Sequence, residues 1–145
     1  MASVQEHFER PPEVIFGVLT DPWRYADWVV GAKKIRGVDE TWPEPGSRFH
    51  HRVGLGPLTI EDSTVVEAFN PPNRLVLRAR ARPAGIARVT ITLVPTRDGG
   101  TDVEMAEQPI GGPARWIHNP LLDALIATRN RKSLRKLGRL VTSPT

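Results

Sequence analysis

The chain of 145 residues contains no cysteine, and this absence removes a set of chemistries. Without thiols there is no disulfide, no thiolate metal site and no cysteine nucleophile. A chain that uses no disulfide suits the reducing cytosol, so the sequence favours a cytoplasmic protein.

Long apolar runs are missing as well. In the first 20 residues, where a signal peptide would need an apolar run, polar side chains interrupt it at Gln5, Glu6, His7, Glu9 and Arg10. No later run is long enough to cross a bilayer, which predicts no transmembrane segment. There is also no phosphate-binding loop, no nucleophile elbow and no metal-binding His/Glu spacing on a helix, so we expect no metal and no cofactor.

The residues that are present are those of a globular domain. Hydrophobic residues make up 39% of the chain and charged residues 25%. The length favours one domain over residues 1–145. The net charge is +4, and such an excess can attract nucleic acid, acidic lipid or an anionic ligand, but it does not choose between them.

The patterning predicts a strand, two short helices, about six antiparallel strands and a long closing helix. Each predicted strand has one apolar face, and only the closing helix is long enough to cover that face. We therefore predict an α+β fold, in which a curved antiparallel sheet of about seven strands wraps around the C-terminal helix and encloses a pocket. The predicted strands are 3–10, 35–42, 47–55, 58–69, 74–82, 87–94 and 101–108, the short helices begin at Pro11-Pro12 and Asp21, and the closing helix covers 113–141.

The closing helix has an apolar stripe that two polar residues, Asn130 and Ser133, interrupt. A stripe of this kind is typical of a helix that covers a cavity. An ordinary alternative is that both groups hydrogen-bond to backbone or buried water. The apolar residues are Ile126, Leu134, Leu137, Leu140 and Val141; the basic residues expected to face away from the cavity are Arg129, Arg131, Lys132, Arg135, Lys136 and Arg139.

This order of elements, together with four local signatures, resembles the START-like superfamily of polyketide cyclases, dehydrases and lipid carriers. Its helix-grip fold is shared with the birch-pollen allergen. The resemblance implies a cavity for an apolar or amphipathic ligand and leaves the chemistry open. The signatures are Pro12-Glu13-Val14-Ile15-Phe16 to Leu19 followed by Asp21-Pro22 and Tyr25 to Trp28; Val65 to Glu67 with Asn70-Pro71-Pro72-Asn73-Arg74-Leu75; Gly99-Gly100-Thr101 with Val103 and Met105; and Arg129-Asn130 with Ser133-Leu134 and Leu137.

Three titratable residues are candidates for catalysis. His51 shares strand parity with Phe49 and should face the cavity, where an imidazole can act as a general acid or base. Asp62 and Glu107 are in phase with apolar residues of their own strands, and a carboxylate beside His51 would orient its tautomer or act as a base. The alternatives are an inert histidine in the pocket wall, an aspartate at the wet mouth and a glutamate at a frayed strand end.

The remaining inward positions are predicted to line the ligand site. Aromatic side chains among them suit flat apolar ligands. For Trp28 a place in the core is the alternative, and Trp116 precedes a segment that can serve as a lid. The predicted ligand-binding residues are Tyr25, Trp28, Phe49, Val53, Ile60, Leu77, Ile91, Met105, Trp116, Ile126, Asn130 and Ser133.

The basic residues on the predicted outer faces lack the interleaved aromatic residues of a nucleic-acid surface, so nucleic acid is not the expected partner. These are Arg78, Arg80, Arg82 and Arg88 on the sheet and the six on the closing helix.

Three functions remain open. The first is binding of a small hydrophobic or amphipathic molecule, with acid–base cyclisation or dehydration by His51 as its catalytic form. The second is a non-catalytic carrier or sensor. The third is a protein-interaction module that works through the basic helix face, including Arg131, Arg135 and Arg139. The sequence leaves the oligomeric state open.

Overall fold

The computed structural model describes residues 2–29, 32–55, 58–81, 85–111 and 120–142, with only the backbone at 32–34, 36, 51–55, 58–62, 81 and 122. Within these residues the predicted order of elements is confirmed. The strands are β1 (Ala2–Phe8), β2 (Ala32–Val38), β3 (Arg48–Leu55), β4 (Leu58–Asn70), β5 (Arg74–Ala81), β6 (Gly85–Pro95) and β7 (Thr101–Gly111), and the helices are α1 (Pro12–Leu19), the 3-10 turn η1 (Pro22–Arg24), α2 (Tyr25–Trp28) and α3 (Pro120–Thr142).

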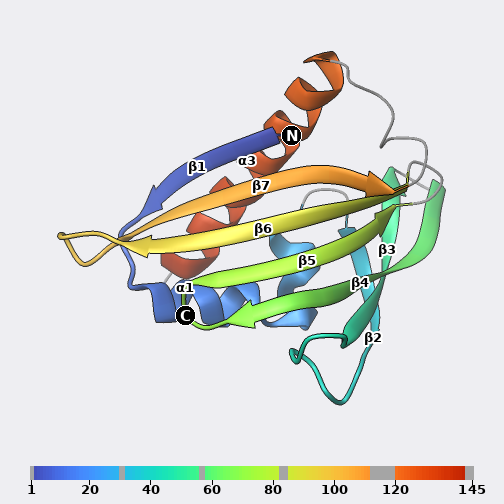
Figure 1. The fold of residues 1–145 in the computed structure, drawn as a ribbon, viewed down its shortest axis with the longest axis horizontal. Helices are drawn as coiled ribbons and strands as arrows, with labels where there is room; N and C mark the ends of the chain where they lie inside the picture. The colour runs from blue at the N-terminus through green and yellow to red at the C-terminus, as the bar shows by residue number, and fades with distance from the viewer. Residues whose placement is uncertain (1, 30–31, 56–57, 82–84, 112–119, 143–145) are drawn as a thin grey trace.

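All described strands belong to one antiparallel sheet with the order β1-β7-β6-β5-β4-β3-β2. Figure 1 shows the sheet curving, with α3 across one face and α1 at one end. A register shift in β4 between Val66 and Ala68 leaves Glu67 as an extra residue. A bulge of this kind bends a strand and increases its twist, which helps the sheet to curve around α3.

Turn chemistry fixes the hairpin between β6 and β7, as the Asp98-Gly99-Gly100 sequence predicts. Gly99 has a φ of +84°, a left-handed conformation that glycine adopts without steric cost. The Asp98 carboxylate accepts a hydrogen bond from the Gly100 backbone N–H at 2.9 Å.

The two short helices begin where the sequence places them. Pro12 opens α1, and Ile15, Phe16 and Leu19 form its buried face. The Asp21 carboxylate caps the following turn by accepting from the Trp23 backbone N–H at 3.1 Å.

The core lies between the inner face of the sheet and α3. Phe8 of β1 packs so closely on the helix that a Cβ added at Gly138 would lie 2.7 Å from its ring. A glycine therefore sets the approach of α3 to the sheet. The buried apolar residues that form this core include Val4, Ile15, Trp28, Leu75, Leu77, Ile91, Leu93, Val103, Met105, Leu134, Leu137 and Val141.

Some predicted bounds were wrong. Strand β2 ends at Val38, not at 42, because Asp39 begins the turn: its carboxylate accepts from the Arg48 backbone N–H at 3.0 Å. Trp42 lies in that turn, where its indole N–H donates to the Thr20 carbonyl at 2.8 Å. The described part of the closing helix begins at Pro120, and residues 112–119 lie outside the described residues.

Candidate ligand-binding site

Glu107 is a carboxylate on the apolar inner face of the sheet. Its cross-strand neighbours are Ala2 on β1 and Val89 on β6, and Val89 in turn pairs with Leu77. Glu107 is only 7% exposed, which agrees with the inward parity predicted from its strand. It does not lie at a frayed end, since β7 continues to Gly111. A charge at such a position is costly unless it is paired and hydrogen-bonded.

Two neighbouring residues of α3 provide those partners. The Arg129 Nη2 donates to Glu107 Oε1 at 2.5 Å, and the Asn130 Nδ2 donates to the same oxygen at 3.2 Å. The Arg129 guanidinium also donates to Asn130 Oδ1 at 3.4 Å. We call these three residues the Glu107 cluster. It joins the helix to the sheet through polar groups in a largely apolar interior.

Arg129 corrects the sequence prediction that all six basic residues of the helix face away from the interior. It precedes Asn130 on the helix, and its long side chain turns inward to reach Glu107 while 44% of it stays exposed. An amphipathic projection missed it because the projection assigns a direction to the Cα–Cβ bond and not to the end of a long side chain.

Tyr25 of α2 connects this cluster to a group of aromatic residues. Burial raises the pKa of its phenol to about 12, a rise that a hydrogen bond with Thr64 and the charge of Arg129 oppose and the charge of Glu107 increases. Its ring packs edge-on against Phe49 and Trp28, with centroids 4.6 Å and 5.8 Å away. The phenol is therefore neutral at physiological pH and close to the ionic groups.

Trp28 contributes a buried donor. The side chain is 1% exposed, and its indole Nε1 has no hydrogen-bond partner among the described residues. Buried tryptophan N–H groups normally find a partner, because leaving one unpaired costs free energy. The donor is thus available to a ligand oxygen or a water molecule.

The structure brings most of the other predicted positions into the same interior. Phe49, Leu77, Ile91, Met105 and Ser133 are buried, and Ile126 is half-buried. At His51, Val53, Ile60 and Asp62 only the backbone is described, and Trp116 lies outside the described residues. The roles of all these residues remain predictions.

The backbone register nevertheless places the two candidate catalytic positions together. Residues 51 and 62 are direct partners across β3 and β4, two residues from the partner pair Phe49 and Thr64. Phe49 and Thr64 are both buried.

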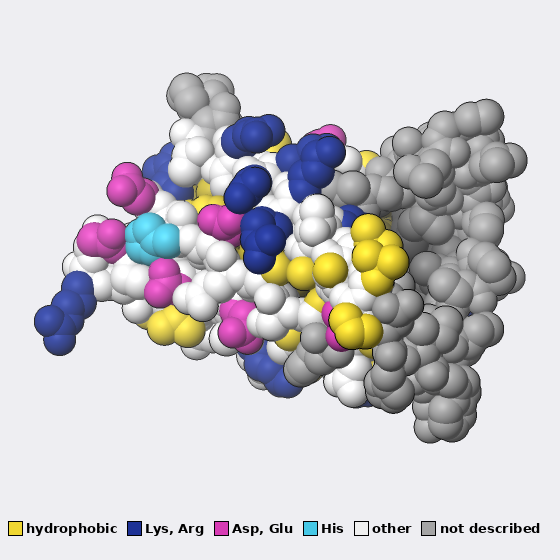
Figure 2. Space-filling view, turned by 90° about the horizontal axis from the view of Figure 1, so that it is seen from above, with side chains coloured by type: hydrophobic (Ala, Val, Ile, Leu, Met, Phe, Trp, Pro, Cys, Tyr) yellow, Lys and Arg dark blue, Asp and Glu magenta, His cyan; other side chains and the backbone are white. Residues whose placement is uncertain are grey.

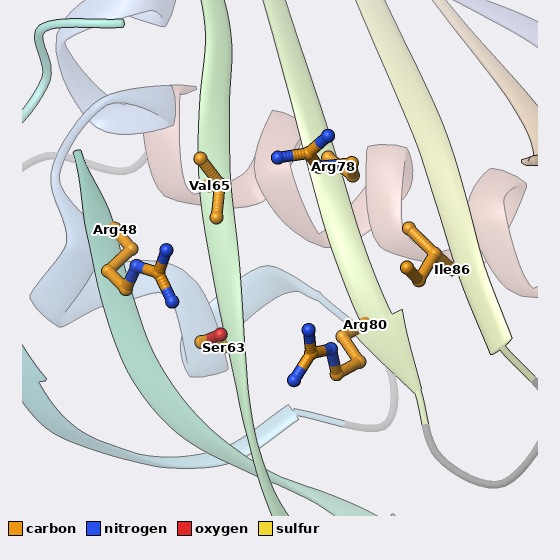
Figure 3. Close-up of a pocket in the computed structure, with 6 residues that line it drawn as sticks. All are labelled: Arg48, Ser63, Val65, Arg78, Arg80 and Ile86. Carbon is orange, nitrogen blue, oxygen red and sulfur yellow. The ribbon is translucent and has the colours of Figure 1, made fainter. Parts of the chain in front are cut away.

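A different depression lies on the outer face of the sheet (Figure 3). Small residues of β4 form its floor, longer residues of the neighbouring strands form its walls, and its volume is about 280 Å³. Glu67 lies on this face too and forms ion pairs with Arg88 at 2.8 Å and Arg78 at 3.9 Å. The depression is lined by Arg48, Ser63, Val65, Arg78, Arg80 and Ile86. It opens away from the Glu107 cluster.

Two further observations bear on the class of site. Within the described residues, no three His, Asp or Glu side chains are placed to hold a metal ion together. No described helix is both long enough and apolar enough to span a membrane.

Comparison with solved structures identifies the fold. A protein from Rhodobacter sphaeroides is 23% identical with a TM-score of 0.74, covering 98% of this chain and 92% of its own. A protein from Chromobacterium violaceum is 21% identical with a TM-score of 0.71, covering 99% and 100%. The allergen Ara h 8.0201 is 11% identical with a TM-score of 0.76, covering 98% and 97%. The fold is therefore the helix-grip fold.

The sequence defines the family more directly. Residues 1–142 match the family described as "Polyketide cyclase / dehydrase and lipid transport", and the chain belongs to it. No curated protein matches the chain. Membership of this family, with a helix-grip fold, supports a role in binding a hydrophobic ligand.

Proposed function

We propose that the protein binds a small amphipathic molecule between the inner face of the sheet and α3, with the polar end of the ligand at the Glu107 cluster. The observation that carries this proposal is the buried carboxylate of Glu107, held by Arg129 and Asn130 on a largely apolar face of the sheet. Apolar burial would supply affinity at roughly 25 cal/mol per Å², less the cost of ordering the ligand. The polar groups would fix its orientation.

The charges of the cluster favour an uncharged polar group on the ligand. Arg129 is already neutralised by Glu107 at 2.5 Å, so a carboxylate ligand would meet the Glu107 charge without a free cation to offset it. A hydroxyl or carbonyl group carries no such penalty. Glu107 and the Asn130 amide can accept from a hydroxyl, and the unpaired Trp28 N–H can donate to an oxygen.

The same site favours a second candidate function, in which the bound molecule reacts. It is cyclisation or dehydration of a carbonyl compound with His51 as the proton carrier and Asp62 orienting its tautomer. The observation that supports it is the direct pairing of positions 51 and 62 next to the buried pair Phe49 and Thr64. The bound geometry would then hold the substrate close to its reacting conformation.

One variant separates the enzyme from a carrier or sensor. For an enzyme, His51→Ala abolishes turnover of a co-purified ligand while its dissociation constant stays nearly unchanged. Turnover that survives in His51→Ala removes the catalytic role and leaves the carrier or sensor.

The binding proposal is tested with two naphthalene probes, 2-naphthol, which carries a neutral hydroxyl, and 2-naphthoate, which carries a carboxylate. Isothermal titration calorimetry should give tighter binding for 2-naphthol. Asn130→Leu should weaken 2-naphthol binding by about fivefold, since one buried hydrogen bond contributes about 1 kcal/mol. Thr128→Leu, a matched change on the exposed side of α3, should leave the affinity unchanged.

Native mass spectrometry of protein purified from its own host identifies the natural ligand. We expect a non-covalent adduct that is released on unfolding. Protein that carries no adduct and produces no binding heat with either naphthalene probe would contradict the proposed function.

A further inference from the structure

The exposed side of α3 carries a concentrated positive charge. Five cations line a shallow groove of about 430 Å³ together with Thr128. In Figure 2 the dark blue side chains gather over this helix. We call the five residues the basic face: Arg131, Lys132, Arg135, Lys136 and Arg139.

The protein offsets little of this charge. Arg135 forms an ion pair with Glu6 at 3.5 Å, and the other four cations have no ion-pair partner among the described residues. Each of the five residues has another member of the basic face three or four positions away along the helix. At that spacing like charges destabilise a helix. Four of the five cations therefore keep their charge available to an anionic partner.

Two leucines extend the same side of the helix toward its N-terminus. Leu121 and Leu125 are 65% and 60% exposed, and their spacing of four places them about 40° apart around the axis. At the same 100° per residue, Lys132 and Arg139 fall within the sector that the two leucines define. The yellow side chains beside the dark blue ones in Figure 2 show that apolar and basic groups adjoin on this side.

We infer that this side of α3 docks on an anionic lipid surface. Lysine and arginine attract acidic headgroups, and exposed leucines enter the boundary between headgroups and acyl chains, so the pairing of the two is what an interfacial helix presents. A nucleic acid would be served by aromatic residues among the cations, and the residues of this face include none. The inference goes beyond the proposed ligand site and does not depend on it.

Sedimentation with vesicles tests this docking. The full chain should bind vesicles of phosphatidylcholine mixed with phosphatidylglycerol, bind phosphatidylcholine alone far more weakly, and be released as salt is raised. Reversing Arg131, Lys132 and Arg139 to Glu should reduce the partition coefficient on the order of 100-fold, at about fivefold for each cation near the surface. Leu121→Ser with Leu125→Ser should reduce it about tenfold.

A triple reversal on the outer face of the sheet is the control for the change in net charge. Reversing Arg48, Arg78 and Arg80 to Glu changes the net charge by the same amount at the other group of arginines. This variant should lose no more than about threefold, the residual effect of net charge alone. Circular dichroism of each variant confirms that it is folded.

Three results would overturn the inference. They are an equal loss in both triple reversals, binding to phosphatidylcholine alone as tight as to the mixed vesicles, and retention of a duplex DNA but not of vesicles. The last of these would assign the basic face to nucleic acid.

Discussion

The C-terminal half of α3 buries mainly apolar residues, whereas its N-terminal half also brings polar side chains against the sheet. Toward its C-terminus, Leu134, Leu137 and Val141 are buried within the main apolar core, and Gly138 lets Phe8 approach closely. Toward its N-terminus, Arg129 and Asn130 hydrogen-bond to the Glu107 carboxylate on β7, near the half-buried Ile126 and Ala127.

The two halves of α3 contribute differently to the stability of the fold. Close apolar packing supplies the larger part of the folding free energy. A buried ion pair seldom stabilises a fold more than apolar residues of the same volume would, since desolvation opposes the attraction. The C-terminal half therefore acts as the anchor of the fold, and the N-terminal half holds the polar groups that bind the ligand in the proposed function.

The largest expected effect comes from breaking the anchor. Leu137 is fully buried, and Leu137→Ala should lower the free energy of unfolding by about 2–5 kcal/mol, from lost transfer free energy and the cavity left behind. Urea titration measures this loss. Calorimetry at a temperature where the variant is folded should give the wild-type dissociation constant for 2-naphthol. A much weaker affinity would mean that the two halves are not separate in function.

Gly138 and Gly17 differ in the space around them, so alanine at each position should change stability in opposite directions. A methyl group at Gly138 would collide with the Phe8 ring at 2.7 Å, whereas nothing lies within 4 Å of a methyl group at Gly17 in α1. Gly138→Ala should destabilise the fold by about 1–2 kcal/mol despite its gain in helix propensity. Gly17→Ala should stabilise it by about 0.5–1 kcal/mol. The two changes in thermal midpoint should have opposite signs, and a shared sign would contradict the packing described for α3.

At the polar half, a change of charge should alter selectivity more than stability. Glu107→Gln keeps an acceptor for Arg129 and Asn130 but releases the Arg129 charge, which is partly solvated already. We expect a loss of about 1 kcal/mol in the free energy of unfolding. The preference for 2-naphthol over 2-naphthoate should shrink or reverse. An unchanged preference would show that the Glu107 charge does not select the ligand.

The smallest expected effect is a pH dependence of stability at the exposed hairpin between β6 and β7. His7 hydrogen-bonds to Asp102 at 2.8 Å and to Asp98 at 3.1 Å, and these carboxylates raise the pKa of its imidazole. A raised folded-state pKa means that the stabilisation is complete below the unfolded-state value of about 6.5 and is lost as pH rises through the folded-state value. Between pH 6 and 8, the urea midpoint of the wild type should therefore fall more than that of His7→Gln. Parallel pH profiles would contradict this.

Most elements of the fold and part of the candidate site could be predicted from the sequence. The alternation of strands, the Asp21 cap and the polar interruptions at Asn130 and Ser133 follow from local periodicity and capping rules. The inward carboxylate at Glu107 follows from strand parity. Its bond to Arg129 could not be predicted, because the distance between β7 and α3 depends on packing across the whole domain.

Other features were beyond local rules for the same reason. The end of β2 depends on a hydrogen bond between Asp39 and the backbone of Arg48 on the next strand. The unpaired Trp28 donor is a property of everything packed around it. Neither leaves a signal in a window of neighbouring residues, since both are set by contacts between distant segments.

The most direct test of ligand binding in the interior follows the indole N–H resonances of the tryptophans by two-dimensional 1H–15N NMR. Saturating 2-naphthol should shift the Trp28 resonance strongly, because its unpaired donor gains an acceptor. The Trp23 resonance should stay in place, since that side chain is 62% exposed and outside the core. A Trp28 resonance that does not move while calorimetry reports saturation would place the ligand elsewhere and contradict ligand binding in the interior.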